Sequence, residues 1–137
     1  MKKWRFLFIY LLGAIQISTF AAPKEKEKKV EEPKRVYLYG VSIDFNDSIV
    51  YLTDVQHVDS VTINPDGSIQ NYAGYSLQLK VYLEGILGES NQTCAVIYSD
   101  KKRKLEKRFL KMRKKYQTDK NVILKYIGTD AFTFEKR

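Results

Sequence analysis

The chain has 137 residues, a length that provides one domain with a modest core but not two. Its 24 lysine and arginine residues outnumber 16 aspartate and glutamate residues, which gives a formal net charge of +8 at pH 7. Cys94 is the single cysteine, so an internal disulfide is excluded. Burial of apolar side chains, among them ten tyrosines and seven phenylalanines, therefore has to hold the domain together.

The first 22 residues have the order of features found in a secretory signal peptide. A cationic start at 1–5 precedes an apolar run at 6–15, and small residues follow at Thr19 and Ala21. This order predicts export, with residues 1–21 removed as a signal peptide. The alternative is an uncleaved signal anchor in the inner membrane, because the uncharged stretch 6–22 is just long enough to cross a bilayer.

A spacer and a folded part follow the predicted signal peptide. Residues 22–35 mix lysine and glutamate between two prolines and carry too few apolar side chains to order themselves, which predicts a disordered charged linker. A single folded domain is then expected over 36–137. The Met-Lys-Lys start and the lysine-rich mature chain are typical of a bacterial protein, so the expected location is periplasmic or associated with the outer envelope.

Strand and helix patterns alternate along the folded part. Runs rich in β-branched and aromatic residues predict strands at 36–45, 49–55, 58–63, 93–98, 121–127 and 131–135. The stretch 75–87 fits a strand or a helix, but its leucines, Ser76 as a cap and Gly88 as a stop favour a helix. A second helix is predicted at 101–116, capped by Ser99 and Asp100.

These elements define an expected architecture. Their order, β-β-β-α-β-α-β-β, predicts an α+β fold in which two helices pack on one face of a small mixed β-sheet. The almost continuous apolar run at 93–98 predicts a central strand that is buried on both sides. Cys94 lies in this run and is expected to be a small buried thiol rather than a nucleophile.

The helix at 101–116 carries the strongest functional signal. Its residues 101–115 hold ten basic side chains against one acid, a net charge of +9, whereas 36–100 have a net charge of −7. Apolar side chains recur as one stripe that is expected to face the sheet, at Leu105, Phe109, Met112 and Tyr116. Five cations are then turned toward solvent as the candidate partner-binding residues: Lys104, Lys107, Arg108, Lys111 and Lys115.

A basic helix of this kind attracts anionic partners. In an exported protein these are an envelope component, such as a lipid headgroup, lipopolysaccharide or cell-wall polymer, or an acidic protein face. Nucleic acid is disfavoured by export and by the absence of Asn, Gln, Ser and Thr between Asp100 and Gln117, which could read base edges. The alternative without a partner is an ordinary solvated helix face.

Other candidate sites are weaker. His57 is the single histidine and cannot assemble a metal site alone, and the hairpin residues Asp44, Asn46 and Asp47 match turn chemistry better than a calcium loop. The sequence contains no Ser/His/Asp set, Cys/His pair or glycine-rich phosphate loop, so no metal, cofactor or catalytic residue is predicted.

The favoured function is therefore a non-enzymatic binding or assembly module of the bacterial cell envelope. One alternative is a small envelope enzyme that uses carboxylates of the acidic half at 36–66, such as Asp44, Asp47 and Asp54. In an enzyme these carboxylates should converge in a pocket, whereas in a binding module they should be scattered on turns. Another alternative is a structural subunit that pairs with its partner through a strand edge.

The order of signal peptide, charged spacer, strand 36–44, hairpin 45–51, cysteine-containing strand and basic helix resembles short uncharacterised exported proteins of Gram-negative anaerobes. The resemblance covers residues 36–135 and implies no particular activity. Residues 76–135 are also similar, in their alternation of helices and strands, to the sporulation-related repeat domain, a small cell-wall-binding module. That similarity implies a fold and not a function.

Overall fold

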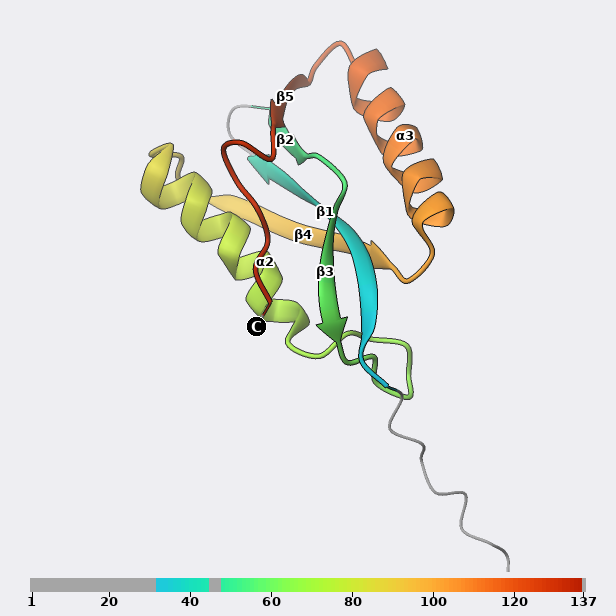
Figure 1. The fold of residues 1–137 in the computed structure, drawn as a ribbon. Coiled ribbons are helices and arrows are strands. Elements are labelled where there is room, and N and C mark those ends of the chain that lie inside the picture. The colour runs from blue at the N-terminus through green and yellow to red at the C-terminus, as the bar shows by residue number, and fades with distance from the viewer. Residues whose placement is uncertain (1–31, 45–47, 137) are drawn as a thin grey trace, which may run out of the picture.

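The computed structural model describes residues 32–44 and 48–136 of the protein (Figure 1). The predicted signal peptide, the linker up to residue 31 and the loop residues 45–47 lie outside the described residues. A mixed five-stranded sheet carries two helices, which confirms the predicted α+β class. The elements are β1 (Lys34–Asp44), β2 (Ile49–Thr53), β3 (Gln56–Val61), α2 (Tyr72–Val81), the π-helical segment η1 (Tyr82–Ile86), β4 (Gln92–Ser99), α3 (Lys102–Thr118) and β5 (Ile123–Ile127).

β1 is the centre of the sheet. It pairs antiparallel with β4 on one side and with β2 and β3 in turn on the other, and β5 extends the sheet as a parallel neighbour of β2. β1 starts earlier than predicted, because Lys34 already pairs with Val61 and the Arg35 guanidinium donates a hydrogen bond to Asp59. The last two residues of the predicted linker therefore belong to the sheet.

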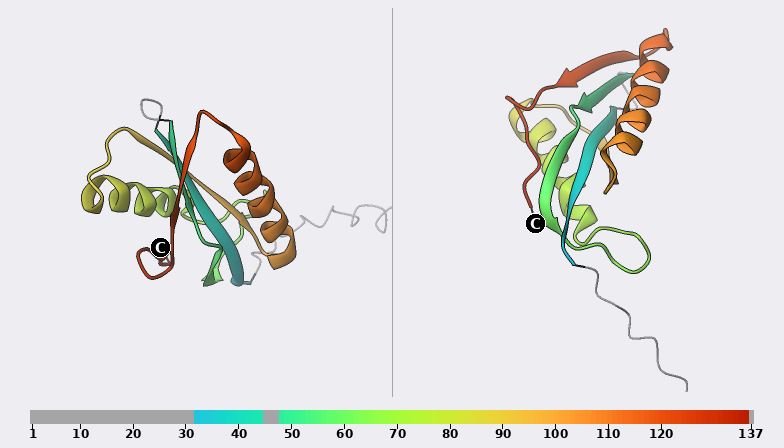
Figure 2. Two further views of the ribbon diagram at one scale, coloured as in Figure 1. Left: turned by 90° about the horizontal axis from the view of Figure 1, so that it is seen from above. Right: turned by 45° about the vertical axis from the view of Figure 1, so that its right-hand side comes forward.

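The two helices lie on opposite faces of the sheet, so the prediction that both pack on one face is wrong (Figure 2). Alternate side chains of β1 point to the two faces. Leu38 belongs to the core under α2, and Tyr39 belongs to the core under α3. Both side chains are 1% exposed. A strand that is apolar at consecutive positions needs a helix on each side, and the run at 36–41 is such a strand.

The predicted helix at 75–87 is present and begins three residues earlier, at Tyr72. Tyr75 and Leu79 are buried against the sheet, and η1 continues the helix until Gly88 adopts the positive φ of 70° that ends it. Ser76 lies within α2 and does not cap it. Leu79 packs so closely on β1 that its Cδ2 lies 2.6 Å from the position a Cβ would take on Gly40.

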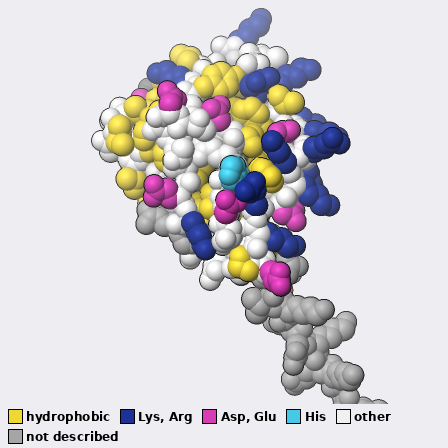
Figure 3. Space-filling view, in the orientation of Figure 1, with side chains coloured by type: hydrophobic (Ala, Val, Ile, Leu, Met, Phe, Trp, Pro, Cys, Tyr) yellow, Lys and Arg dark blue, Asp and Glu magenta, His cyan; other side chains and the backbone are white. Residues whose placement is uncertain are grey.

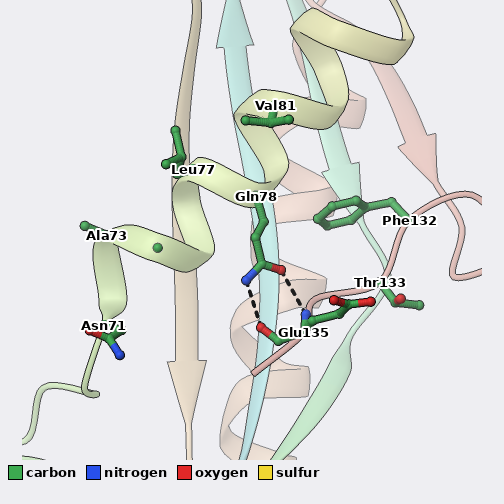
Figure 4. A pocket seen from close by; sticks show the side chains of 9 residues that line it. Asn71, Ala73, Leu77, Gln78, Val81, Phe132, Thr133 and Glu135 are labelled. Atoms are coloured by element: carbon green, nitrogen blue, oxygen red, sulfur yellow. Dashed lines mark hydrogen bonds between the residues drawn. The ribbon is translucent and has the colours of Figure 1, made fainter. Parts of the chain in front are cut away.

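The predicted final strand at 131–135 does not form, and glutamine side chains hold this tail instead. Nε2 of Gln56 donates to the carbonyl of Phe132 at 3.0 Å, and its Oε1 accepts from the N–H of Phe134 at 2.8 Å. Gln78 binds the N–H and carbonyl of Glu135 in the same way, both at 2.8 Å (Figure 4). Like a peptide group, a side-chain carboxamide has a carbonyl oxygen that accepts and an N–H that donates. Two glutamines therefore take the place of a neighbouring strand.

β4 is an edge strand, so the prediction of a central strand buried on both sides is wrong. Within the described residues it pairs with β1 alone. Val96 is buried, but Thr93 and Ala95 are exposed on the opposite face. Cys94 is half-buried, its thiol donates to Oγ of Ser42 at 3.4 Å, and burial raises its pKa.

Candidate binding face on helix α3

α3 follows β4 directly and runs back across the sheet to the start of β5 (Figure 1). The backbone N–H of Lys101, the residue before the helix, donates to Oγ of Ser99 at 3.1 Å, but no side chain caps the helix itself. The predicted apolar stripe faces the sheet: Leu105 is fully buried, and Phe109, Met112 and Tyr116 pack around it. The ring of Phe109 meets Tyr39 edge-on, with ring centroids 5.2 Å apart.

This anchoring turns the basic side chains of α3 outward. All five predicted partner-binding residues are exposed: Lys104, Lys107, Arg108, Lys111 and Lys115. Figure 3 shows lysine and arginine side chains gathered along the side of the molecule that α3 forms. Oε1 of Glu106, the acid of this helix, lies 3.9 Å from Nζ of Lys102, which is not one of the five candidate cations. We call these five residues the basic face.

Three residues of the basic face border a hollow between α3 and the sheet. Arg108, Lys111 and Lys115 line it together with Tyr39, Ile97 and Met112, and its volume is about 300 Å³. The hollow thus combines an apolar floor with a cationic rim. Lys104 and Lys107 do not line it.

The hollow can accept an anionic group through hydrogen bonds as well as charge. Arg108 supplies a planar guanidinium suited to carboxylate or phosphate oxygens, and the lysines supply point charges. Burial raises the pKa of Tyr39 above its ordinary value of 10.0. Lys115 lies over the ring of Tyr116 at 5.4 Å from the centroid, which holds this cation close to the helix. Tyr39 and Ile97 were not predicted as site residues, because their β-sheet position gives no sign that they lie under α3.

The carboxylates proposed for an enzyme do not converge where the structure describes them. Asp44 ends β1, and the register of β1 and β2 places Asp54 level with Tyr39, five residues away along the sheet. At about 3.3 Å per residue their backbone positions are separated by about 16 Å along the sheet. Asp47 lies outside the described residues.

The other acids of this half have local partners. Arg35 lowers the pKa of Asp59 through a hydrogen bond, and the hydroxyl and N–H of Ser68 lower that of Asp66. These carboxylates form hydrogen bonds with nearby residues, as expected of turn and surface residues.

Two unpredicted carboxylates share a hollow on the α2 side. Glu89 and Asp130 line a space of about 520 Å³ with Lys125 and Tyr51 among its other residues. The hydroxyl of Tyr51 donates to Oε1 of Glu89 at 2.7 Å, and burial together with this contact raises the pKa of Tyr51 to about 12. The contact ties Glu89 to β2 of the sheet.

The remaining candidates fit structural roles in the described part of the chain. The ring of His57 meets Tyr37 at 6.2 Å between centroids. Residues 32–44 and 48–136 contain no cluster of three or more His, Cys, Asp or Glu side chains suited to a metal ion. No helix in these ranges combines the length and apolar character needed to cross a membrane.

No protein-family model matches the sequence, and neither curated proteins nor solved structures give a match. The resemblance to exported proteins of Gram-negative anaerobes therefore stays a prediction, as does the similarity to the sporulation-related repeat domain.

Proposed function

We propose that the protein is an exported, non-enzymatic binding or assembly module of the bacterial cell envelope, which docks on an anionic partner through the basic face of α3. The observation that carries this proposal is the gathering of five exposed cations on one anchored helix, three of them around an apolar hollow. Export rests on the signal-peptide pattern at 1–21.

The fold favours recognition through α3 because the helix is fixed before any partner arrives. Its buried stripe packs on the sheet, so binding need not order the backbone that carries the charges. Exposed charges act over a screening length of about 8 Å at physiological ionic strength, so docking of this kind is expected to weaken as salt is added.

The test is charge reversal on the helix against charge reversal elsewhere. The triple variant Lys107→Glu, Arg108→Glu and Lys111→Glu inverts the centre of the basic face. The matched control, Lys120→Glu, Lys125→Glu and Lys136→Glu, changes the net charge equally at three exposed positions outside α3. Capture is measured on vesicles with an anionic lipid, on an acidic cell-wall polymer and on beads carrying acidic peptides, with neutral vesicles as background.

We expect the α3 variant to lose capture at physiological salt and the control to keep most of it. The arm that retains the unmodified protein identifies the source of the anion. Unfolding should be nearly unchanged in both variants, since surface substitutions usually alter stability by less than about 0.5 kcal/mol. Equal retention of the two variants, or no retention of the unmodified protein in any arm, would contradict the proposal.

A further inference from the structure

The outer edge of β4 has backbone groups that point away from the sheet. The hydroxyl of Tyr72 donates to the carbonyl of Val96 at 2.8 Å and accepts from the N–H of Val96 at 3.4 Å. Both backbone groups of Val96 therefore face outward, away from β1. Backbone groups alternate along an antiparallel strand, so those of Gln92 and Cys94 face outward as well.

Two features that usually prevent pairing with another strand, charged residues and proline, are absent from β4 itself. Tyr72 occupies the pairing position at Val96, and its ring lies 5.7 Å from that of Tyr98, so it closes one end of the edge. The outer edge of the stretch from Gln92 to Ala95 is left open. No strand of the described residues lies beside this edge, since β1 pairs with the opposite edge.

The two sides of the open stretch differ in chemistry. On the α2 side a hollow of about 330 Å³ separates the helix from the edge, and its lining includes Ala73, Ser76, Leu77, Lys80 and Cys94. Leu77 is 56% exposed there, which leaves apolar surface without a neighbour. On the α3 side the cationic hollow of Arg108, Lys111 and Lys115 begins at Ile97 of the same strand, two residues beyond the open stretch.

We propose that the open edge of β4 takes up an extended segment of a partner protein, which adds to the sheet as a further strand. Side chains of such a strand alternate between the two faces. Those toward α2 would be apolar, to cover Leu77, and those toward α3 would be acidic, to meet Arg108 and Lys111. This inference rests on the proposed function and identifies its anionic partner as an acidic protein segment.

A second copy of the chain fits this edge less well. Two copies joined through β4 about a two-fold axis would carry both α3 helices on the same face of one continuous sheet. Residues 101–115 have a net charge of +9 in each copy, so the two helices would repel each other. A partner segment with acidic side chains would instead bond the open backbone groups of β4 and pair with the cations of α3.

The experiment follows backbone amide exchange by NMR while a soluble peptide is added. The probe is an eight-residue peptide that alternates valine and glutamate. The control peptide has the same composition with the valines in one block and the glutamates in another. In the free protein the amides of Thr93 and Ala95 are already bonded to β1, whereas those of Gln92 and Cys94 face outward.

We expect the alternating peptide to slow exchange at Gln92 and Cys94 about tenfold or more while leaving Thr93 and Ala95 almost unchanged. Leu77→Glu, at an exposed site, should remove this protection and preserve capture on anionic surfaces, because the basic face is intact. Three outcomes overturn the inference: no protection by the alternating peptide, equal protection by the block peptide, or protection in the free protein together with a dimeric mass. Capture by anionic vesicles or polymer without protection of β4 would overturn the inference alone and leave the proposed function standing.

Discussion

Oε1 of Gln56 accepts a hydrogen bond of 2.8 Å from the backbone N–H of Phe134, although 78 positions separate the two residues. Gln56 starts β3 and is 8% exposed, and the ring of Phe134 is buried in the core under α2. The same carboxamide donates to the carbonyl of Phe132, so one side chain binds a backbone carbonyl and a backbone N–H of the tail. The end of the chain is thus attached to the core by side-chain amides.

Replacement of Gln56 by methionine should destabilise the domain. The variant keeps the side-chain length but leaves the buried N–H of Phe134 without its acceptor, a loss of about 1–3 kcal/mol. Gln78→Met is the matched control, since Gln78 makes equivalent bonds to Glu135 at an exposed position, where the loss should be nearer to about 0.5 kcal/mol. Urea unfolding measures both, and equal losses would show that burial of the Gln56 bonds is not important.

Gly40→Ala should also be destabilising, because the new methyl group would lie 2.6 Å from Cδ2 of Leu79 and 3.0 Å from the ring of Phe134. Overpacking of this kind costs about 1–3 kcal/mol. Combining it with Leu79→Ala, which frees that space, should give a double variant more stable than the sum of the single losses predicts. Additive losses in urea unfolding would mean that the two positions do not compete for space.

Alkaline pH should weaken the fold through Tyr51. Its pKa is raised from 10.0 to about 12 in the folded protein, by burial and by the bond to Glu89. The unfolded chain therefore loses this proton more readily than the folded chain, and the stability due to Tyr51 falls as pH rises from about 10 to about 12. Unfolding free energies measured across this window should decline less steeply in Tyr51→Phe than in the unmodified protein, and parallel declines would contradict the assignment.

The thiol of Cys94 should react slowly with a bulky maleimide at pH 7. Burial raises its pKa, which lowers the thiolate fraction, and the side chain is half-buried beside Ser42. We expect labelling to accelerate when the domain is unfolded by urea. Labelling of the native protein at the rate of free glutathione would show that the side chain is accessible. Cys94→Ala should cost about 1 kcal/mol, a typical value for one substitution.

Much of the fold could be predicted because local patterns and tertiary packing agree. The stripe from Leu105 to Tyr116 predicts both the helix and its buried side, and Gly88 predicts where the other helix ends. The sequence is less informative about which elements are neighbours. The apolar run at 93–98 suits a central strand, but Thr93 and Ala95 are exposed, and β1 is its one partner among the described residues. Both facts reflect the order of strands in the sheet, which no local pattern contains.

The errors at the third and last strands have a common cause. Gln56 appears polar in the sequence and lies outside the predicted strand 58–63, yet the structure places it first in β3 as the partner of the tail. The run at 131–135 has the composition of a strand, but side chains satisfy its backbone. The basic residues of α3 could be predicted as a candidate site from the sequence. Tyr39 and Ile97 could not, because they lie beside these residues only through tertiary packing.

The central position of β1 has a consequence for how the chain folds. β1 opens the domain, yet its longest ladder is with β4, where Tyr37 meets Ser99 and Asp44 meets Gln92. Contacts between segments so far apart in sequence carry a large loop-closure cost and slow folding. A chain that emerges from its N-terminus onward cannot complete this sheet until β4, and then β5, have followed. One edge of β1, the first strand to appear, therefore stays unpaired until β4 has followed it.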